Sequence, residues 1–381
     1  MSVISNNGNS LGLEKASSLL HTNEKNIFIA EKSSEFRPHR GMLEEKSNLI
    51  QDIELYRMAR SGYTSSPLLF KSFTNATLVK KYGIVLTQDE KFIEETVSAQ
   101  KWLDPSLSFM KDALNISKNQ LVEISGNALF ANHGNYCVYG HFICETALSI
   151  FTMRNLIIEK GIKIILPRDN MHYIESILNI LQIPKQQRLY LSDSRAYRLE
   201  NLIISSACSS GVTFHPGRSL MGMSTHFKNL LCNKPVSPNP TRLYLTRDNA
   251  NTTSKRILKN DQELSERLKL LNFTRIEPSS YTFEDQVRIF SEAEIIVGPH
   301  GSAFTNMIFM KPGGFVLDII PEHWIGPGLN FTSHLSNLAD LNYSFLLSKS
   351  KEIEGGYENY VDCDLVISKI HKFLNSEFDV N

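Results

Sequence analysis

The chain has 381 residues, of which 41% are hydrophobic and 21% charged, as in an ordinary globular protein and unlike a disordered or fibrous one. Its 40 basic residues balance 40 acidic ones, so no global field attracts nucleic acid, and we expect no nucleic-acid partner. A chain of this length exceeds what one hydrophobic core usually organises, which predicts two domains.

The N-terminus and the cysteines bear on the cellular compartment. The five cysteines are widely spread and include no C-x-x-C pair, which favours a reducing compartment over a disulfide framework or a zinc site. Residues 1–10 are polar and lack the basic flank and apolar core of a signal peptide, and no apolar run is long enough to cross a bilayer. We therefore expect a cytoplasmic protein.

The first half of the chain begins with a polar stretch, residues 1–60, which we interpret as an N-terminal arm with an amphipathic segment at 43–58. Residues 61–232 then alternate short apolar runs with helical patterns. Nearly continuous apolar strands of this kind are typical of a sheet covered on both faces, so we predict an N-terminal α/β domain. The predicted strands are 76–79, 83–86, 121–124, 128–130, 163–166, 188–191 and 202–205, and the predicted helices 141–156 and 171–181.

The second half has the clearest strand–helix alternation. Residues 233–240 carry three prolines among polar residues and are predicted to be a linker. Thr282, with Asp285 three residues later, resembles a capping box at the start of a helix. The predicted strands are 242–246, 274–276, 294–297 and 315–320, and the predicted helices 261–271, 283–293 and 302–310. This pattern predicts a Rossmann-like C-terminal domain over 241–361, before a closing helix (365–374) in the tail 362–381.

The most informative motif is a glycine turn after a buried strand that ends at Val297. Gly298 and Gly301 frame the turn and a helix starts at once, so free backbone N–H groups and a helix dipole would face a pyrophosphate. His300 could then donate to a phosphate oxygen. The alternative is that the glycines only permit a sharp turn and that His300 caps a carbonyl. The turn lacks the G-x-G-x-x-G pattern, which counts against a nicotinamide-dependent oxidoreductase.

This region resembles glycosyltransferase family 61, whose members have a His-Gly-Ala-Gly-Leu-Thr-Asn run at this point, then Pro-Gly and an acidic strand. Ser302 and Ala303 stand where the family usually has Ala and Gly, and the Cβ of Ala303 narrows the pocket. The matching residues are His300–Asn306, Pro312-Gly313, Val316–Ile319, Leu245-Thr246-Arg247, Lys255-Arg256, Phe283 with Gln286-Val287, and Tyr139, His141, Phe142 and Glu145.

The resemblance implies an inverting, metal-independent hexosyl- or pentosyltransferase with a GT-B-like fold, in which two Rossmann-like domains face across a cleft. It implies a UDP-sugar donor and a hydroxyl of a glycan or glycolipid as acceptor, with bacterial surface polysaccharide synthesis as the expected pathway. No cofactor is expected, and the enzyme could be peripheral at the inner face of the membrane. The alternative is a catalytically weak or inactive nucleotide-sugar or glycan-binding protein on the same fold.

Further donor-side candidates come from the strand ends. Arg247 follows a strand, where its guanidinium could bind two phosphate oxygens, or pair with Asp248 or Glu263 instead. Arg256 is expected in a loop over the same crevice, and Asp318, at a strand end, could accept from a ribose hydroxyl or cap loop N–H groups. The remaining donor-side candidates, Ser302, Ala303, Thr305, Asn306 and Gln286, have helix capping or helix packing as their alternative.

The acceptor side is expected in the N-terminal half. His141 and Glu145 are four residues apart, on one face of a predicted helix. Inverting transfer needs one base beside the acceptor hydroxyl, and a carboxylate oriented by a histidine could serve, with His133 and Asp193 as the next candidates. The alternative for the pair is an i,i+4 ion pair that bridges the domains.

One metal-like pattern is discounted. Asp362 and Asp364 form a D-x-D, by which metal-dependent transferases hold a cation, but they lie just before the closing helix and far from any strand end. We interpret Asp362 as a helix N-cap and expect no metal site.

Overall fold

The computed structural model describes residues 27–36, 62–93, 96, 108–131, 138–166, 171–208, 216–232, 240–247, 255–354 and 356–375. The chain splits into two compact units, Met1–Ser34 with Thr64–Met223 and Glu35–Tyr63 with Ser224–Asn381. Most of the predicted arm and of the predicted linker, including the amphipathic segment 43–58, lies outside the described residues, so these boundaries stay predictions.

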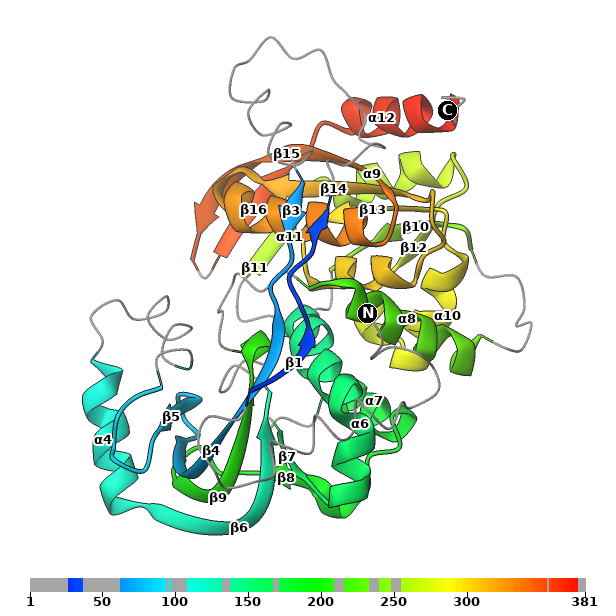
Figure 1. Cartoon of the computed structure of the whole chain (residues 1–381). Helices are drawn as coiled ribbons and strands as arrows, with labels where there is room; N and C mark the ends of the chain where they lie inside the picture. The colour runs from blue at the N-terminus through cyan, green and yellow to red at the C-terminus, as the bar shows by residue number, and fades with distance from the viewer. Residues whose placement is uncertain are drawn as a thin grey trace. The chain divides into compact units, whose positions relative to one another are not determined.

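The first unit is built on a mixed, seven-stranded sheet in the order β1-β4-β9-β6-β7-β8, with β5 paired to β4 (Figure 1). Strands β9, β6, β7 and β8 run parallel to one another. Strand β4 pairs antiparallel with β9, with β1 and with β5. The strands are β1 (Ile27–Glu31), β4 (Leu68–Val79), β5 (Ile84–Leu86), β6 (Leu121–Phe130), β7 (Lys163–Leu166), β8 (Arg188–Tyr190) and β9 (Ala196–Ser205).

Local pattern explains most of this unit, with one correction. The predicted strands 121–124 and 128–130 are a single strand, β6, whose pairing with β9 shifts register between Ile124 and Asn127. A β-bulge of this kind interrupts the apolar pattern without ending the strand. Helices α4 (Phe109–Asn119) and α7 (His172–Ile180) are amphipathic, and α4 was not predicted.

The predicted helix at 141–156 is a longer, composite helix. It begins as α5 (Tyr139–His141), continues as a π-helical segment, η2 (Phe142–Ala147), and ends as α6 (Leu148–Lys160). Gly161, with φ of 64°, terminates it in the left-handed conformation that glycine adopts without strain.

The second unit is built on another mixed, seven-stranded sheet, in the order β11-β16-β15-β14-β13-β10-β12. Strands β12, β10, β13, β14 and β15 are parallel, and β16 pairs antiparallel to β15. The strands are β10 (Arg242–Leu245), β11 (Lys255–Leu258), β12 (Thr274–Ile276), β13 (Ile295–Pro299), β14 (Phe315–Pro321), β15 (Asn342–Ile353) and β16 (Gly356–Tyr360). A separate two-stranded sheet joins β2 (Glu35–Phe36) to β3 (Tyr63–Thr64).

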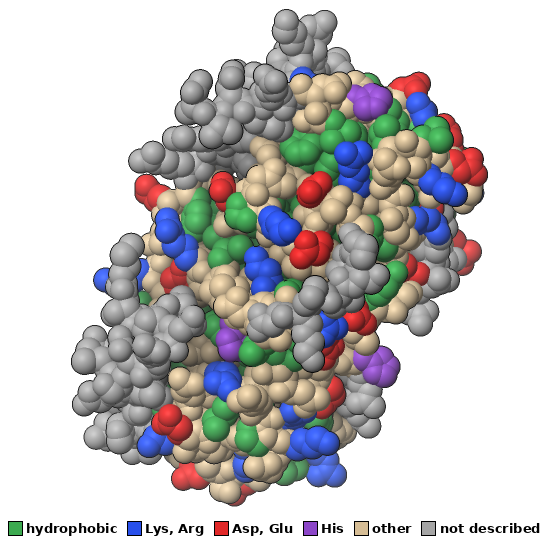
Figure 2. Space-filling model, turned by 90° about the vertical axis from the view of Figure 1, so that its right-hand side faces the viewer, with side chains coloured by type: hydrophobic (Ala, Val, Ile, Leu, Met, Phe, Trp, Pro, Cys, Tyr) green, Lys and Arg blue, Asp and Glu red, His purple; other side chains and the backbone are tan. Residues whose placement is uncertain are grey.

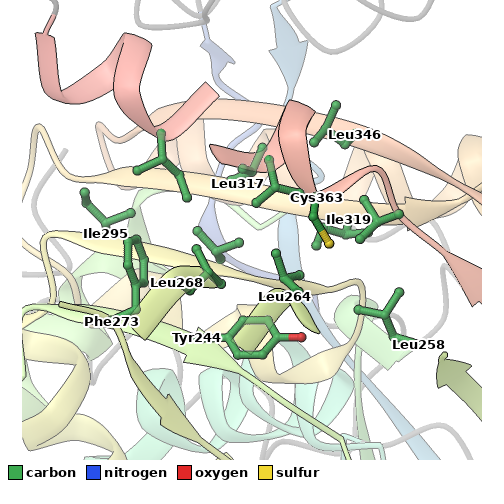
Figure 3. Packing of buried hydrophobic residues seen from close by; sticks show 14 of the residues in the cluster. Tyr244, Leu258, Leu264, Leu268, Phe273, Ile295, Leu317, Ile319, Leu346 and Cys363 are labelled. Carbon is green, nitrogen blue, oxygen red and sulfur yellow. The ribbon is translucent and has the colours of Figure 1, made fainter. Parts of the chain in front are cut away.

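One face of this sheet packs against α9 (Asp261–Lys269) and α12 (Cys363–Asn375), as Figure 3 shows for Leu264, Leu268 and Cys363. Alternate strand residues, among them Tyr244 and Leu317, point into this cluster, which is the period of two that a strand requires. At the N-terminus of α12 the Asp362 carboxylate accepts from the N–H groups of Asp364 and Leu365, at 2.9 and 3.2 Å. The predicted N-cap is therefore confirmed.

Further helices follow the remaining strands. In α10 (Phe283–Glu292) the Thr282 hydroxyl accepts from the N–H of Asp285 at 3.1 Å, which confirms the predicted capping interaction. The segment after the glycine turn, η7 (Ser302–Phe309), is a 3₁₀ helix rather than the expected α-helix. Two helices were not predicted, α8 (Arg218–Leu231) and α11 (Ile325–Leu338), and α11 packs on β14 and β15.

Both units combine helices with a mixed sheet, so the α/β class is confirmed. Figure 2 shows one face of the molecule, on which Lys and Arg side chains are interspersed with Asp and Glu, as the balanced composition leads one to expect. None of the helices formed by the described residues is long and apolar enough to span a membrane.

Candidate functional site

The glycine turn lies at the point of the second sheet where the strand order reverses. Apart from β11, which comes between β10 and β12 in the chain but lies at the opposite edge, the parallel strands β10, β12, β13, β14 and β15 lie in the order 2-1-3-4-5 when numbered along the chain, with β12 and β13 on either side of β10. Ligands of open α/β sheets bind at the carboxyl ends of the strands at such a switch point. Arg247 follows β10 and His300 follows β13, so the topology brings both to this edge.

The two glycines of the turn are required for space rather than for backbone conformation. Gly301 is extended, with φ of 169° and ψ of 178°, which any residue can adopt. A Cβ on Gly298, however, would lie 2.6 Å from the carbonyl oxygen of Leu245. A Cβ on Gly301 would run into Nη1 of Arg247. The turn therefore packs directly against the end of β10 and the guanidinium of Arg247.

Because the two glycines contact different groups, we expect different losses of stability in the two alanine variants. Gly298→Ala places a methyl group against backbone of the neighbouring strand, which cannot move alone, so the free energy of unfolding should fall by about 1–3 kcal/mol. Gly301→Ala meets the end of a flexible side chain, so stability should hardly change while Arg247 is displaced. Denaturant unfolding of both variants checks the first expectation, and UDP titration of Gly301→Ala checks the second. Equal losses of stability would contradict this view of the turn.

Arg247 is tied to the turn by a hydrogen bond. Its Nη1 donates to the carbonyl oxygen of His300 at 3.0 Å, and the residue is half-buried. Of the two partners considered from sequence, Glu263 instead pairs with Arg267 within α9, and Asp248 lies outside the described residues. The guanidinium of Arg247 is thus held at the carboxyl end of the sheet, beside the backbone of the turn.

His300 is buried against a carboxylate. Its Nδ1 lies 2.9 Å from Oδ2 of Asp318, and the side chains are 6% and 0% exposed. The same oxygen accepts from the hydroxyl of Thr332 at 2.7 Å and from that of Tyr343 at 3.4 Å. Asp318 lies inside β14, which continues to Pro321, rather than at a strand end as expected.

The other donor-side candidates divide into two groups. Asn306 and Gln286 are buried and bonded to each other, since Asn306 Nδ2 donates to Gln286 Oε1 at 2.9 Å, which joins η7 to α10. Thr305 is also fully buried, while Ser302 and Ala303 are half-buried in the first turn of η7, next to Gly301.

Arg256 lies in strand β11, so the expectation of a loop over the crevice is wrong. Its strand pairs with β16 at the edge of the sheet, and β16, β15 and β14 separate it from β13. The strand forms by pairing with a segment about a hundred residues away, which local sequence does not reveal. The sheet order does not bring Arg256 to the glycine turn.

In the first unit the composite helix follows β6, next to the end of β9. The parallel strands lie in the order 3-2-1-4, read from β8 to β9, so the switch point is between β6 and β9. Thr146 donates to the carbonyl oxygen of Ala131, just after β6, at 2.7 Å. The hydroxyls of Ser149 and Ser205 lie 2.7 Å apart and fasten the helix to the end of β9.

His141 and Glu145 are in contact, with Nδ1 of the imidazole 2.6 Å from Oε1 of the carboxylate. The His141 side chain is 26% exposed and that of Glu145 5%. Glu145 lies in the π-helical segment, and such segments are frequent at functional sites. The fallback candidate Asp193 pairs with Lys80 at 3.3 Å, and His133 lies outside the described residues.

Two opposing effects act on the pKa of His141. Burial lowers it, while the charge of Glu145 and the hydrogen bond to it raise it, and the net result is a pKa above the ordinary value of 6.5. A raised histidine pKa means that the charged pair contributes stability below pH 6.5 and that this contribution is lost as the pH rises through the raised pKa. The imidazole of the pair therefore loses its charge above pH 6.5.

Four polar residues of these two edges were missed from sequence. The hydroxyls of Thr332 and Tyr343 both donate to Asp318. Those of Ser149 and Ser205 connect the composite helix to β9. Each contacts a residue of another element that is at least 11 positions away in the chain, so no local pattern identifies it. Among the described residues no group of three or more His, Cys, Asp or Glu side chains is arranged to hold a metal ion.

Each unit is thus an α/β fold with polar side chains at the switch point of its sheet. The family Glycosyltransferase 61 matches residues 139–317, a little under half of the chain, from the composite helix to β14. The resemblance found in the sequence is thereby confirmed over residues 139–317, which match the model of this family. No curated protein matches the chain.

Proposed function

We propose that the chain is an inverting, metal-independent glycosyltransferase that transfers a sugar from a UDP donor to a hydroxyl of a glycan or glycolipid. Family membership supports transfer of a sugar in general. The observation that carries the finer proposal is the meeting of Arg247 and His300 at the carboxyl ends of β10 and β13. A hexosyl or pentosyl donor and a role in bacterial surface polysaccharide synthesis, in the cytoplasm or at the inner membrane face, complete the proposal.

The donor side stabilises the leaving diphosphate with fixed cationic and N–H groups. A guanidinium presents paired donors that match phosphate oxygens and stays charged at every working pH. Arg247 is restrained by the carbonyl of His300, so little side-chain entropy is lost when phosphate binds. The close packing at Gly298 and Gly301 holds the turn against the end of β10 and against the guanidinium of Arg247. Ser302, Ala303 and Thr305 follow in the same segment as candidate contacts.

The acceptor side supplies the base. Glu145 takes the proton of the acceptor hydroxyl while the oxygen forms a bond to the anomeric carbon of the sugar. The bond from that carbon to the β-phosphate oxygen breaks, and its electron pair leaves with UDP. His141 orients the carboxylate through the 2.6 Å contact. Inversion at the anomeric carbon follows from this single displacement.

The strand orders support a GT-B-like arrangement of two Rossmann-like domains. The parallel part of the first sheet follows the order 3-2-1-4 and that of the second the order 2-1-3-4-5, both of which occur in doubly wound nucleotide-binding proteins. We place the acceptor domain at 61–232 and the nucleotide-sugar domain at 241–361. Arg256, Asn306 and Gln286 remain candidates for more remote parts of the donor.

The function is tested by a screen of nucleotides and nucleotide sugars for thermal stabilisation, since a ligand that binds only the native state raises its melting temperature. UDP and at least one UDP-sugar should stabilise the protein, and UDP release with an acceptor glycan should continue in EDTA. Activity lost in EDTA and restored by Mn²⁺ would overturn metal independence. Stabilisation without any sugar-dependent release of UDP would instead indicate a binding protein.

Arg247→Ala should weaken UDP binding by more than tenfold, because a charge-assisted phosphate contact is worth on the order of 2 kcal/mol. Isothermal titration calorimetry with UDP measures the loss. The matched control is Arg267→Ala, which removes a charge from α9, where Arg267 pairs with Glu263 and Asp364. Unchanged UDP affinity in a folded Arg247→Ala protein would show that the guanidinium only supports the turn.

A further inference from the structure

The strongest unexplained feature of the second unit is the buried carboxylate of Asp318. It is 0% exposed and lies inside β14, with its Oδ2 contacting His300, Thr332 and Tyr343. Among the described residues its other oxygen, Oδ1, has no hydrogen-bond partner. A charge taken out of water costs several kcal/mol unless a partner balances it. A carboxylate in this position therefore indicates a specific role.

Of the three side chains that contact Oδ2, only His300 can carry a positive charge. Thr332 and Tyr343 have neutral hydroxyl groups, whose oxygens lie 2.9 Å apart. Together they hold the carboxylate in one orientation. The four side chains come from the end of β13, from β14, from α11 and from β15. Such a buried, multiply bonded set fixes the position of each ring and carboxylate more tightly than a surface pair would.

We infer that Asp318 is a positioning residue for His300, and that Thr332 and Tyr343 hold Asp318 in place, rather than Asp318 being a ribose ligand. Asp318 binds the Nδ1–H of the imidazole, so the ring turns its other nitrogen, Nε2, to the ligand. The catalytic role that this inference gives to His300 rests on the proposed function. The matched region ends at Leu317, so Thr332 and Tyr343 lie well beyond it, whereas Asp318 belongs to the acidic strand on which the resemblance rests.

The chemistry of the leaving group decides which form of His300 is useful. A neutral imidazole that gives Nδ1–H to Asp318 has only a lone pair at Nε2, and that lone pair would repel a phosphate oxygen. An imidazolium donates at both nitrogens, to Asp318 through Nδ1 and to the diphosphate through Nε2. Asp318 balances the added charge, so binding of the diphosphate and protonation of His300 support each other.

Nitrogen NMR of histidine-labelled protein tests the positioning directly. The signals of His300 are those missing from a His300→Gln variant. In the wild type Nδ1 should carry a proton without ligand, and both nitrogens should be protonated when UDP is bound. In Asp318→Asn the Nδ1 proton should be lost, since the amide can turn its own NH₂ group to the ring. A wild-type His300 whose Nδ1 is unprotonated would overturn the inference.

Kinetics separate positioning from a merely structural role. In Asp318→Asn we expect kcat to fall by roughly 10²-fold or more, as when an orienting carboxylate beside a catalytic histidine is removed, with a much smaller change in KM. Thr332→Val should give about a tenfold loss in kcat, because the carboxylate remains but is held less firmly. Normal kcat in Asp318→Asn, at an unchanged melting temperature, would contradict the inference.

The control keeps this inference apart from the proposed function. If calorimetry detects no binding of UDP, the proposed function fails, yet the protonation of Nδ1 in the free protein still decides whether Asp318 holds the ring. If Asp318→Asn fails to fold, Thr332→Val and Tyr343→Phe each remove one hydrogen bond to the Asp318 carboxylate and leave the carboxylate itself in place. Both variants should then shift the His300 nitrogen signals, and unshifted signals in both would overturn the inference.

Discussion

Glu145→Gln should lower turnover by roughly 10²–10⁴-fold, because the amide keeps the shape and the hydrogen-bonding capacity of the side chain but cannot take a proton. The side chain of Glu145 is 5% exposed and lies 2.6 Å from His141, so the carboxylate is shielded from bulk water and is held by an oriented partner. UDP affinity should hardly change, because the donor-side candidates belong to the other unit. Initial rates of sugar transfer, together with UDP calorimetry, measure the two effects separately.

A control on the same helix makes this result specific. Glu159→Gln removes a carboxylate from an exposed position of α6 and should leave the rate unchanged. His141→Ala should cost less than Glu145→Gln if the imidazole only orients the base. Near-normal turnover in Glu145→Gln, at a lower melting temperature, would mean that the pair is structural and that the base lies elsewhere.

The pH dependence of the rate gives the same hypothesis a second test. Below the raised pKa of His141 the imidazolium pairs with the carboxylate and weakens it as a base. As the pH rises through that pKa, kcat/KM should increase, while the stability contributed by the charged pair declines. In His141→Gln the rise should disappear from this pH range.

Local sequence predicted the features that depend on a few neighbouring residues. The 2.6 Å contact of His141 with Glu145 follows from their four-residue spacing, and the caps at Thr282 and Asp362 follow from helix-start chemistry. Helix α8 could have been found as well, since Leu220, Met223 and Phe227 recur at helical spacing. The contact of Arg247 with His300 was not predicted, although each was expected to follow a strand on the ligand-binding side of the sheet.

Features that join distant segments could not be predicted in this way. Strand β11 depends on β16, and neither has the apolar alternation that marks a buried strand. The contacts of Asp318 with Thr332 and Tyr343 require β14, α11 and β15 to be in place first. The glycines at 298 and 301 were expected to serve a sharp turn, but their use is close packing against β10, which is also a contact between distant segments.

His300→Ala should lower turnover by about 10²–10³-fold, the range for removing one preorganised donor from a developing negative charge. UDP affinity should fall less, because Arg247 still contacts the diphosphate in the proposed site and the charge of the leaving group develops fully only in the transition state. The matched control is His371→Ala, which removes an exposed imidazole from α12.

The same substitution should also destabilise the fold, and this effect can be separated from the loss of rate. Without His300 the charged carboxylate of Asp318 loses its Nδ1–H donor while it stays buried, which costs about 1–3 kcal/mol in unfolding free energy. Adding Asp318→Asn to His300→Ala removes that charge, so stability should be largely recovered while turnover stays low. Denaturant unfolding and initial rates of the two single variants and the double variant form the complete cycle. Recovery of turnover together with stability in the double variant would mean that His300 acts only through the fold, and that the diphosphate is stabilised by Arg247 and the backbone of the turn.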